Sequence, residues 1–272
     1  MKPVSRTAFY CGAVRMWDAE APEPICGDQF ARVFMTDEAR EFVEPFRESF
    51  YPNATNVARH RVIDDLLRAH LAADPSRRVI VIGAGFDTRA YRLPGGRWVE
   101  LDEPQVIDHK EPRLPAGSAP NPLERIPIDF ATERLADKLA PFRADRSVTV
   151  VVEGVTMYLT RAQLEGLLDT LAEIFPRHSL ICDMFTATFI RRYGARLKQR
   201  LTDIGATFGD LFDDPEPLFR TRGYRPVKVI SIVREARRLG AIPIPLWLIN
   251  TAFRSMANGY RIWEWERRAG AG

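Results

Sequence analysis

Two glycines and an aspartate are the residues whose types and spacing indicate ligand chemistry most clearly. Gly83 and Gly85 follow the short apolar run 79–82, and such a pair lets the backbone turn tightly and approach a ligand closely. Asp102 stands nineteen positions after Gly83, at the end of the next β-prone segment. An acidic side chain there can accept hydrogen bonds from both hydroxyls of a ribose. These residues predict a nucleoside-binding site, although Thr88 stands where a dinucleotide fingerprint has its third glycine.

Two further acidic residues stand at the ends of later apolar segments. Asp129, with Phe130 after it, follows the segment 125–128, and Glu153 follows the segment 148–152. Because ligands of parallel sheets bind outside the carboxyl ends of the strands, we expect these side chains near the same crevice. There Asp129 can accept a hydrogen bond from an adenine amino group while Phe130 packs on the ring face. Glu153 can line the same chamber.

The segments around these residues alternate between short apolar runs and helical patterns. Thr160 is a good N-cap, and leucines at helical spacing follow it over 161–175. This alternation predicts a mostly parallel α/β sheet with helices on both faces. The tail 260–267 alternates apolar and polar residues without a following helix, so we expect an antiparallel strand inserted into the sheet. The expected parallel strands are 79–82, 97–101, 125–128, 148–152 and 179–182.

A single domain over residues 1–272 is the expected organisation. The chain is 46% hydrophobic and 28% charged, as is usual for a protein with one full core. We expect four parts in order: an N-terminal helical cover, a cofactor-binding core, a helical lid insertion, and C-terminal helices with the final strand. Their expected bounds are 1–75, 76–185, 186–225 and 226–272.

The expected lid combines an apolar stripe with a basic face. Insertions after the carboxyl ends of strands overlie the ligand crevice, so Arg192 and Tyr193 are candidates for the substrate pocket, as is Tyr158. The basic face would suit an acidic substrate, and the alternative is an ordinary solvated helix. The stripe contains Phe189, Tyr193, Leu197, Leu201 and Ile204, and the basic face contains Arg191, Arg192, Arg196, Lys198 and Arg200.

Charge and cysteine content argue against several classes of protein. Lys and Arg exceed Asp and Glu by 39 − 36 = 3, too few for a dedicated nucleic-acid or membrane-surface protein. Cys11, Cys26 and Cys182 lie far apart without the spacing of a zinc site or a disulfide scaffold. The first residues lack a signal-peptide pattern. We therefore expect a cytoplasmic protein without a metal, nucleic-acid or membrane partner, whose oligomeric state the sequence leaves open.

Three motifs, at 83–93, 100–104 and 153–159, resemble the leucine carboxyl methyltransferase family. That family groups eukaryotic phosphatase methyltransferases with bacterial polyketide-type O-methyltransferases. The resemblance covers roughly residues 5–185, and the block Gly-Ala-Gly-Phe-Asp-Thr-Arg at 83–89 is specific as a combination. It implies a class I methyltransferase fold with a seven-stranded sheet, and S-adenosylmethionine as the cofactor.

The resemblance also implies roles for individual residues. An arginine in the helix before the first strand should hold the carboxylate of the cofactor's methionine portion. Arg59 and Arg61 both stand in the matching segment, and the spacing to Gly83 favours Arg59. His60 between them departs from the Arg-Thr-Arg of many bacterial members, so the choice stays open. The implied cofactor-binding residues are Arg59, Gly83, Gly85, Asp87, Asp102, Asp129, Phe130 and Glu153.

Together these patterns predict an S-adenosylmethionine-dependent O-methyltransferase for a small organic acid or acidic phenol of polyketide type. Methyl displacement depends on alignment and desolvation, and an acidic acceptor needs no strong base. One alternative is a methyltransferase-like protein that binds the cofactor without methyl transfer. Another is a nicotinamide-dependent oxidoreductase, which shares the glycine turn and the acid after the second strand, but no hydride-transfer residues are evident.

Overall fold

The computed structural model describes residues 2–203 and 205–268, without the side chains of Pro3, Arg196, Leu197 and Arg200. Ile204 and the side chains of Leu197, Arg196 and Arg200, which belong to the expected lid stripe and basic face, therefore lie outside the described residues.

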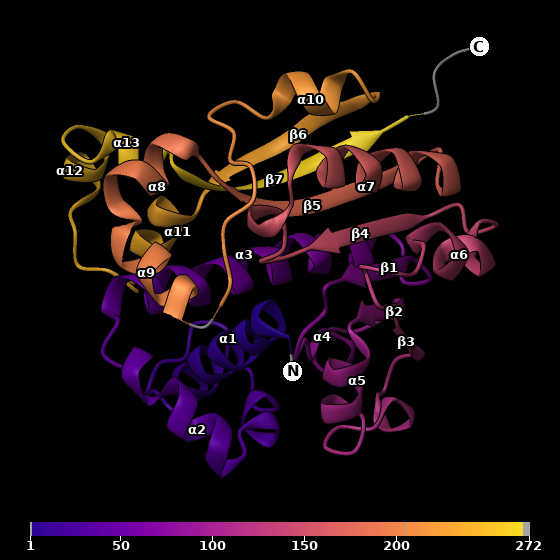
Figure 1. The fold of residues 1–272 in the computed structure, drawn as a ribbon, viewed down its shortest axis with the longest axis horizontal. Coiled ribbons are helices and arrows are strands. Elements are labelled where there is room, and N and C mark those ends of the chain that lie inside the picture. Colours follow the sequence, from indigo (N-terminus) through magenta and orange to yellow (C-terminus); the bar gives the residue numbers. More distant parts are fainter. Residues whose placement is uncertain (1, 204, 269–272) are drawn as a thin grey trace.

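In this part of the chain a seven-stranded sheet runs through the centre of the molecule in the order β3-β2-β1-β4-β5-β7-β6 (Figure 1). Strands β1 to β5 are parallel, whereas β7 is antiparallel to both β5 and β6. The antiparallel strand predicted at 260–267 is confirmed. The strands are β1 (Arg78–Ile82), β2 (Arg97–Asp102), β3 (Leu123–Pro127), β4 (Val148–Val152), β5 (His178–Phe185), β6 (Tyr224–Ser231) and β7 (Tyr260–Arg267).

The chain order of the strands reverses between β1 and β4, which are direct neighbours. Connections leave these two strands in opposite directions along the sheet, so a crevice forms outside their carboxyl ends. This topology alone fixes where a ligand of such a sheet binds.

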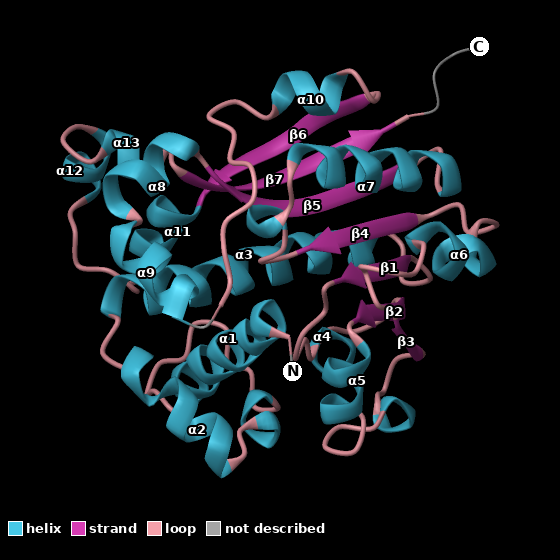
Figure 2. Cartoon of the chain, viewed as in Figure 1, coloured by secondary structure: helices cyan, strands magenta, loops and turns pink. Residues whose placement is uncertain are grey.

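Helices cover both faces of the sheet (Figure 2). Successive strand residues point to opposite faces, so Val79 and Val81 join one buried cluster while Ile80 and Ile82 join the other. The first cluster includes residues of α1 (Pro3–Ala19), α2 (Asp37–Val43), α3 (Phe50–Ala73), α4 (Arg89–Arg92), α5 (Pro104–Lys110), α8 (Ala187–Tyr193), α11 (Ile232–Arg238), α12 (Leu246–Asn250) and α13 (Arg254–Ala257). The second includes residues of α6 (Leu135–Leu139), α7 (Arg161–Ile174) and α10 (Glu216–Arg220).

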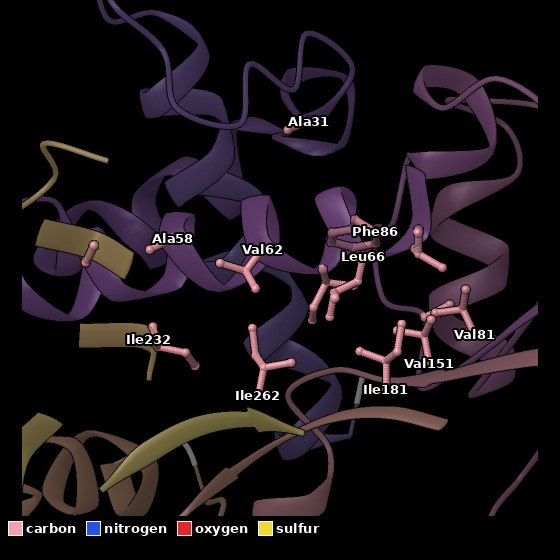
Figure 3. Close-up of a cluster of buried hydrophobic side chains, with 14 of the residues drawn as sticks. Ala31, Ala58, Val62, Leu66, Val81, Phe86, Val151, Ile181, Ile232 and Ile262 are labelled. Atoms are coloured by element: carbon pink, nitrogen blue, oxygen red, sulfur yellow. The ribbon is translucent and has the colours of Figure 1, made fainter. Parts of the chain in front are cut away.

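Helix α3 is the long element that ties the first cluster to the sheet (Figure 3). Its Val62 and Leu66 point toward the sheet, where Ile262 and Ile181 face them. The same helix carries Arg59, less than one turn before Val62. The packing of α3 therefore sets where the Arg59 side chain reaches the carboxyl edge of the sheet.

Among the described residues no helix has the length and apolar character that crossing a bilayer requires.

Strand β6 corrects the expected bounds of the lid. The strand begins at Tyr224, inside the range 186–225, and helix α9 (Ala195–Asp203) lies earlier in the same range. Pro226 is unusual inside a strand, but β6 is at the sheet edge and its register shifts between Pro226 and Lys228. Proline is tolerated at edge strands and bulges. The alternation of Val227 and Val229 with polar residues was the signal that could have found it.

Candidate functional site

A cavity of about 700 Å³ opens at the carboxyl ends of β1, β2 and β4. One wall comes from the turns after these strands, and the rest of the lining comes mainly from α1, residues 130–135 and α7. Most of the residues that the sequence predicted for the site line this cavity. They are Arg59, Gly83, Gly85, Asp87, Asp102, Phe130, Glu153 and Tyr158.

The glycine turn after β1 is fastened to the end of β2. Gly83 and Gly85 have positive φ angles of 68° and 48°, and a Cβ on Gly83 would lie 2.4 Å from Cγ2 of Val155. The Asp102 carboxylate accepts hydrogen bonds from the N–H groups of Gly85 (2.5 Å) and Glu103 (2.7 Å). Burial raises the pKa of Asp102 to about 6. The carboxylate thus lies in the cavity wall with its orientation fixed by two backbone donors.

A fully buried arginine, Arg89, lies beneath the cavity and connects residues of its floor. Its Nε donates to Asp64 Oδ1 (2.6 Å), its Nη2 lies 2.7 Å from Glu153 Oε2, and its Nη1 donates to Asp87. His60 completes the cluster, with Nδ1 2.8 Å from the Arg89 guanidinium. The Asp87 and Glu153 carboxylates are therefore engaged by protein cations, which makes them supports of the cavity wall.

The charges of this cluster stabilise one another. Burial alone would raise the pKa of Glu153, but the guanidinium groups of Arg89 and Arg59 hold it well below its usual range. Asp64 follows the same pattern, since His60 and Arg89 outweigh its burial and lower its pKa. Burial and the positive charge of Arg89 lower the pKa of His60. At neutral pH the cluster thus contains ionised carboxylates, charged arginines and a neutral imidazole; His60 adds its positive charge beside Asp64 only at acid pH, where Asp64 titrates.

The two candidate arginines of α3 have different surroundings in the structure. Arg59 is buried and lines the cavity; its Nε donates to Glu153 Oε1 (2.9 Å). Arg61 points elsewhere: it pairs with Asp65 (3.0 Å) and donates to the carbonyl of Ile25 (2.8 Å). Arg61 is not among the residues lining the cavity. The geometry thus favours Arg59 for any contact with a ligand.

Asp129 is a correction to the predicted site. Its carboxylate accepts a hydrogen bond from Lys2 Nζ (2.8 Å), and the pairing lowers the pKa of Asp129. Asp129 does not line the cavity, whereas its neighbour Phe130 does and leaves 42% of its surface exposed. Asp129 Oδ1 is thus paired with Lys2, the residue before α1, and the side chain lies outside the lining where the adenine contact was expected.

Arg192 and Tyr193 are a second correction, because both are exposed and neither lines the cavity. The Tyr193 hydroxyl lies 2.7 Å from Ser255 Oγ. The stripe of α8 packs back on the protein, where Phe189 stacks on Phe185 with a ring separation of 5.5 Å. Phe189 is therefore packed against the end of β5, and Tyr193 contacts α13.

The loop after α9 is the part of the expected lid that reaches the site. Gly205 lines the cavity. The N–H groups of Gly209 and Asp210 donate to the carbonyls of Met157 and Leu159, both at 2.9 Å. Backbone contacts to the segment before α7 hold this loop at the cavity mouth.

The wall contributed by α1 was not predicted. Val4, Ala8, Cys11 and Arg15 line the cavity, and their spacing of four, three and four residues places them on one helix face. That spacing was the available signal. Arg15 donates to the carbonyl of Phe86 (2.7 Å), which ties α1 to the glycine turn.

Among the described residues no group of His, Cys, Asp and Glu side chains could hold a metal ion.

Comparison with known proteins identifies the family. The family model for Leucine carboxyl methyltransferase matches residues 8–172, more than half of the chain. The chain belongs to the leucine carboxyl methyltransferase family. The family that the motifs at 83–93, 100–104 and 153–159 predicted is therefore confirmed.

Two curated proteins are similar to this chain over different shares of its length. A Parafrankia sp. (strain EAN1pec) protein, named as a candidate S-adenosyl-L-methionine-dependent methyltransferase, is 32% identical over 179 residues, 61% of this chain and 57% of the relative. The tetracenomycin polyketide synthesis O-methyltransferase TcmP of Streptomyces glaucescens is 26% identical over 238 residues, 86% of this chain and 85% of the relative. The match thus spans less than two thirds of the Parafrankia protein's length.

Solved structures confirm the predicted class I methyltransferase fold. A DUF574 family protein from Streptomyces avermitilis has a TM-score of 0.58 at 16% identity, covering 87% of this chain and 96% of that one. The magnesium protoporphyrin IX methyltransferase of Synechocystis has a TM-score of 0.52 at 13% identity, covering 87% and 97%. At such identities the likeness concerns the fold.

Replacement of Arg89 by methionine tests the importance of the buried cluster. The variant leaves three buried carboxylates without their shared cation, so we expect the free energy of unfolding to fall by about 3–5 kcal/mol. Arg61→Met is the matched control on α3: Arg61 is 37% exposed, so its loss should cost no more than about 1 kcal/mol. Urea denaturation of both variants measures the difference. Equal losses would contradict a central role for Arg89.

Proposed function

We propose that this protein transfers a methyl group from S-adenosylmethionine to an oxygen of a small organic acceptor. One observation carries the proposal: a glycine turn, a buried ribose-type carboxylate and a buried arginine meet in one cavity at the switch point of the sheet. Family membership and the names of the relatives support the methyl donor over a nicotinamide cofactor.

The residues of the cavity suit this cofactor from end to end. Asp102 would accept the ribose hydroxyls, since its carboxylate lies in the wall and is oriented by backbone donors. Gly83 lines the cavity without a side chain, so its backbone can approach the methionine end, and the close contact with Val155 leaves no room for a Cβ there. Arg59 would pair with the methionine carboxylate, and Phe130 offers a ring face for the adenine. Asp87 and Glu153 would hold the floor through Arg89.

The bound cofactor supplies a sulfonium methyl group that an acceptor oxygen can displace. The protein's contribution to such a displacement is alignment and exclusion of water. Helix α1 and the loop at Gly205 wall the cavity opposite the glycine turn. Burial raises the pKa of the Tyr158 phenol strongly, so its hydroxyl stays protonated beside Thr7 and can donate a hydrogen bond to the acceptor.

The acceptor class that we propose is a small organic acid or acidic phenol of polyketide type. Its support is the similarity to the tetracenomycin polyketide synthesis O-methyltransferase along 86% of the chain. The charge of Arg192 no longer supports an acidic acceptor, because that side chain lies outside the cavity. The apolar side chains Val4, Val155 and Leu159 on the wall fit a largely apolar ligand.

Ligand binding and methyl transfer test the proposal directly. S-Adenosylmethionine and S-adenosylhomocysteine should raise the melting temperature because they bind the native state, and NAD should not. With isotope-labelled S-adenosylmethionine, label should pass to at least one member of a panel of aromatic acids and phenols. A melting shift with NAD alone would refute the assignment. Binding without transfer to any acceptor would favour the non-catalytic alternative.

Conservative replacement of Arg59 and Arg61, the two candidate arginines of α3, tests the carboxylate site. Arg59→Lys keeps the charge but loses the planar guanidinium, whose contacts to Glu153 and Tyr260 fix the direction of its remaining N–H groups, so S-adenosylhomocysteine should bind about tenfold more weakly. Arg61→Lys should change the dissociation constant by less than about twofold. Calorimetric titration measures both. The reverse ranking would transfer the role to Arg61.

The pKa of Asp102 predicts how cofactor affinity depends on pH. Ribose hydroxyls donate to the ionised carboxylate, and in the free protein the pKa of this group is about 6. Binding therefore releases a proton near that pH, and affinity should fall as the pH drops below about 6, approaching tenfold per unit. Titrations at several pH values measure the slope. Asp102→Asn should bind weakly with a flatter profile, and an unchanged slope in that variant would contradict the prediction.

A further inference from the structure

Two buried polar residues lie beneath Arg59, outside the cavity lining. Asp183 on β5 is fully buried, and Tyr260 on β7 leaves 4% of its surface exposed. Residues 185 and 260 are directly paired across the antiparallel strands, so Tyr260 lies near the carboxyl end of β5. Both residues lie beyond the segment 8–172 that the family model matches.

Hydrogen bonds connect these two residues to the cavity wall. Asp183 Oδ1 accepts from the N–H of Gly154 (2.6 Å), which lines the cavity. Asp183 Oδ2 accepts from the Tyr260 hydroxyl (2.8 Å) and from Arg59 Nη1 (3.3 Å). The Tyr260 oxygen also accepts from Arg59 Nη1 (2.9 Å). The Tyr260 hydroxyl thus accepts a hydrogen bond from the Arg59 guanidinium and donates one to the Asp183 carboxylate.

These contacts fix the plane of the Arg59 guanidinium on two sides. Glu153 holds Nε, while Tyr260 and Asp183 hold Nη1. The remaining group, Nη2, has a 3.7 Å contact with Sγ of Cys11, a residue of the cavity wall. With Nε and Nη1 engaged, Nη2 is the group best placed to donate to a ligand. A guanidinium selects a carboxylate through the direction of its N–H groups, so its orientation decides how well it binds.

We propose that Tyr260 and Asp183 are positioning residues that aim the Arg59 guanidinium at the carboxylate of the bound cofactor. This inference rests on the proposed function, because it assigns the cofactor's amino-acid end to Arg59. The C-terminal strand β7 thereby takes part in cofactor recognition without contacting the cofactor. The arrangement follows the general rule that a binding side chain needs a second set of contacts to hold its rotamer.

Tyr260→Phe is the sharpest variant, because it removes the hydroxyl and keeps the ring. That ring stacks on Phe185 at 3.9 Å between centroids, so the packing of β7 on β5 should survive. Tyr224→Phe is the matched control: Tyr224 is also buried, and its hydroxyl contacts His178 Nε2 (3.0 Å) and the carbonyl of Leu168 (3.3 Å), away from the Arg59 cluster. Both variants lose one buried hydroxyl.

The experiment compares two ligands that differ at the amino-acid end. S-Adenosylhomocysteine carries the carboxylate, and 5′-methylthioadenosine keeps the nucleoside without it. In Tyr260→Phe, S-adenosylhomocysteine should bind about tenfold more weakly while methylthioadenosine binds as in the wild type. Tyr224→Phe should leave both dissociation constants unchanged. Because the comparison is a ratio within one protein, a general loss of stability does not produce it.

A second variant and a double mutant complete the test. Asp183→Asn keeps the size of the side chain and removes its charge, and it should weaken S-adenosylhomocysteine selectively in the same way. In an Arg59→Lys background, Tyr260→Phe should have no further effect on the ligand ratio. Equal weakening of both ligands, or an unchanged ratio in Tyr260→Phe and Asp183→Asn, would overturn the inference. If the wild type binds neither ligand, the proposed function itself fails.

Discussion

The ion pairs of the buried Arg89 guanidinium are the interactions on which the site depends most. It contacts Asp64 of α3, Asp87 in the turn after β1, and Glu153 after β4. A charge this deeply buried is tolerated only when it is paired and hydrogen-bonded. Separating α3 from the sheet edge would therefore leave several uncompensated charges at once. Docking of α3 on the sheet edge and the cavity floor thus depend on the same ion pairs.

The network of buried charged and polar side chains continues from Arg89 toward the cavity. Glu153 pairs with Arg89 on one oxygen and with Arg59 on the other, so the two arginines share one support. Arg59 is held in turn by Asp183 and Tyr260, the latter 201 positions away in the sequence. A residue that faces the cavity thus depends on β5 and β7, two paired strands that are far apart in the sequence. Such a network gives a fixed geometry only when all its members are present.

The two walls of the cavity have different origins. The turns after β1, β2 and β4 belong to the sheet that proteins of 13–16% identity share. The opposite wall comes from α1 and the loop at Gly205, which are fastened by side chains such as Lys2 and Arg15 and by backbone bonds to residues 157 and 159. Differences between acceptors within one family can arise on the second wall while the first stays constant.

The sequence by itself determined the features that neighbouring residues encode. The run into Gly83, the carboxylate at Asp102, and the tail at 260–267 follow from local backbone preference and strand periodicity. Only the tertiary structure decided which distant groups meet. Lys2 pairs with one carboxylate oxygen of Asp129, 127 positions away, although the local sequence suggested an adenine contact for Asp129. The tertiary structure likewise leaves Arg192 outside the cavity. The local sequence pattern determines which residues share one side of a helix, whereas packing determines what that side faces.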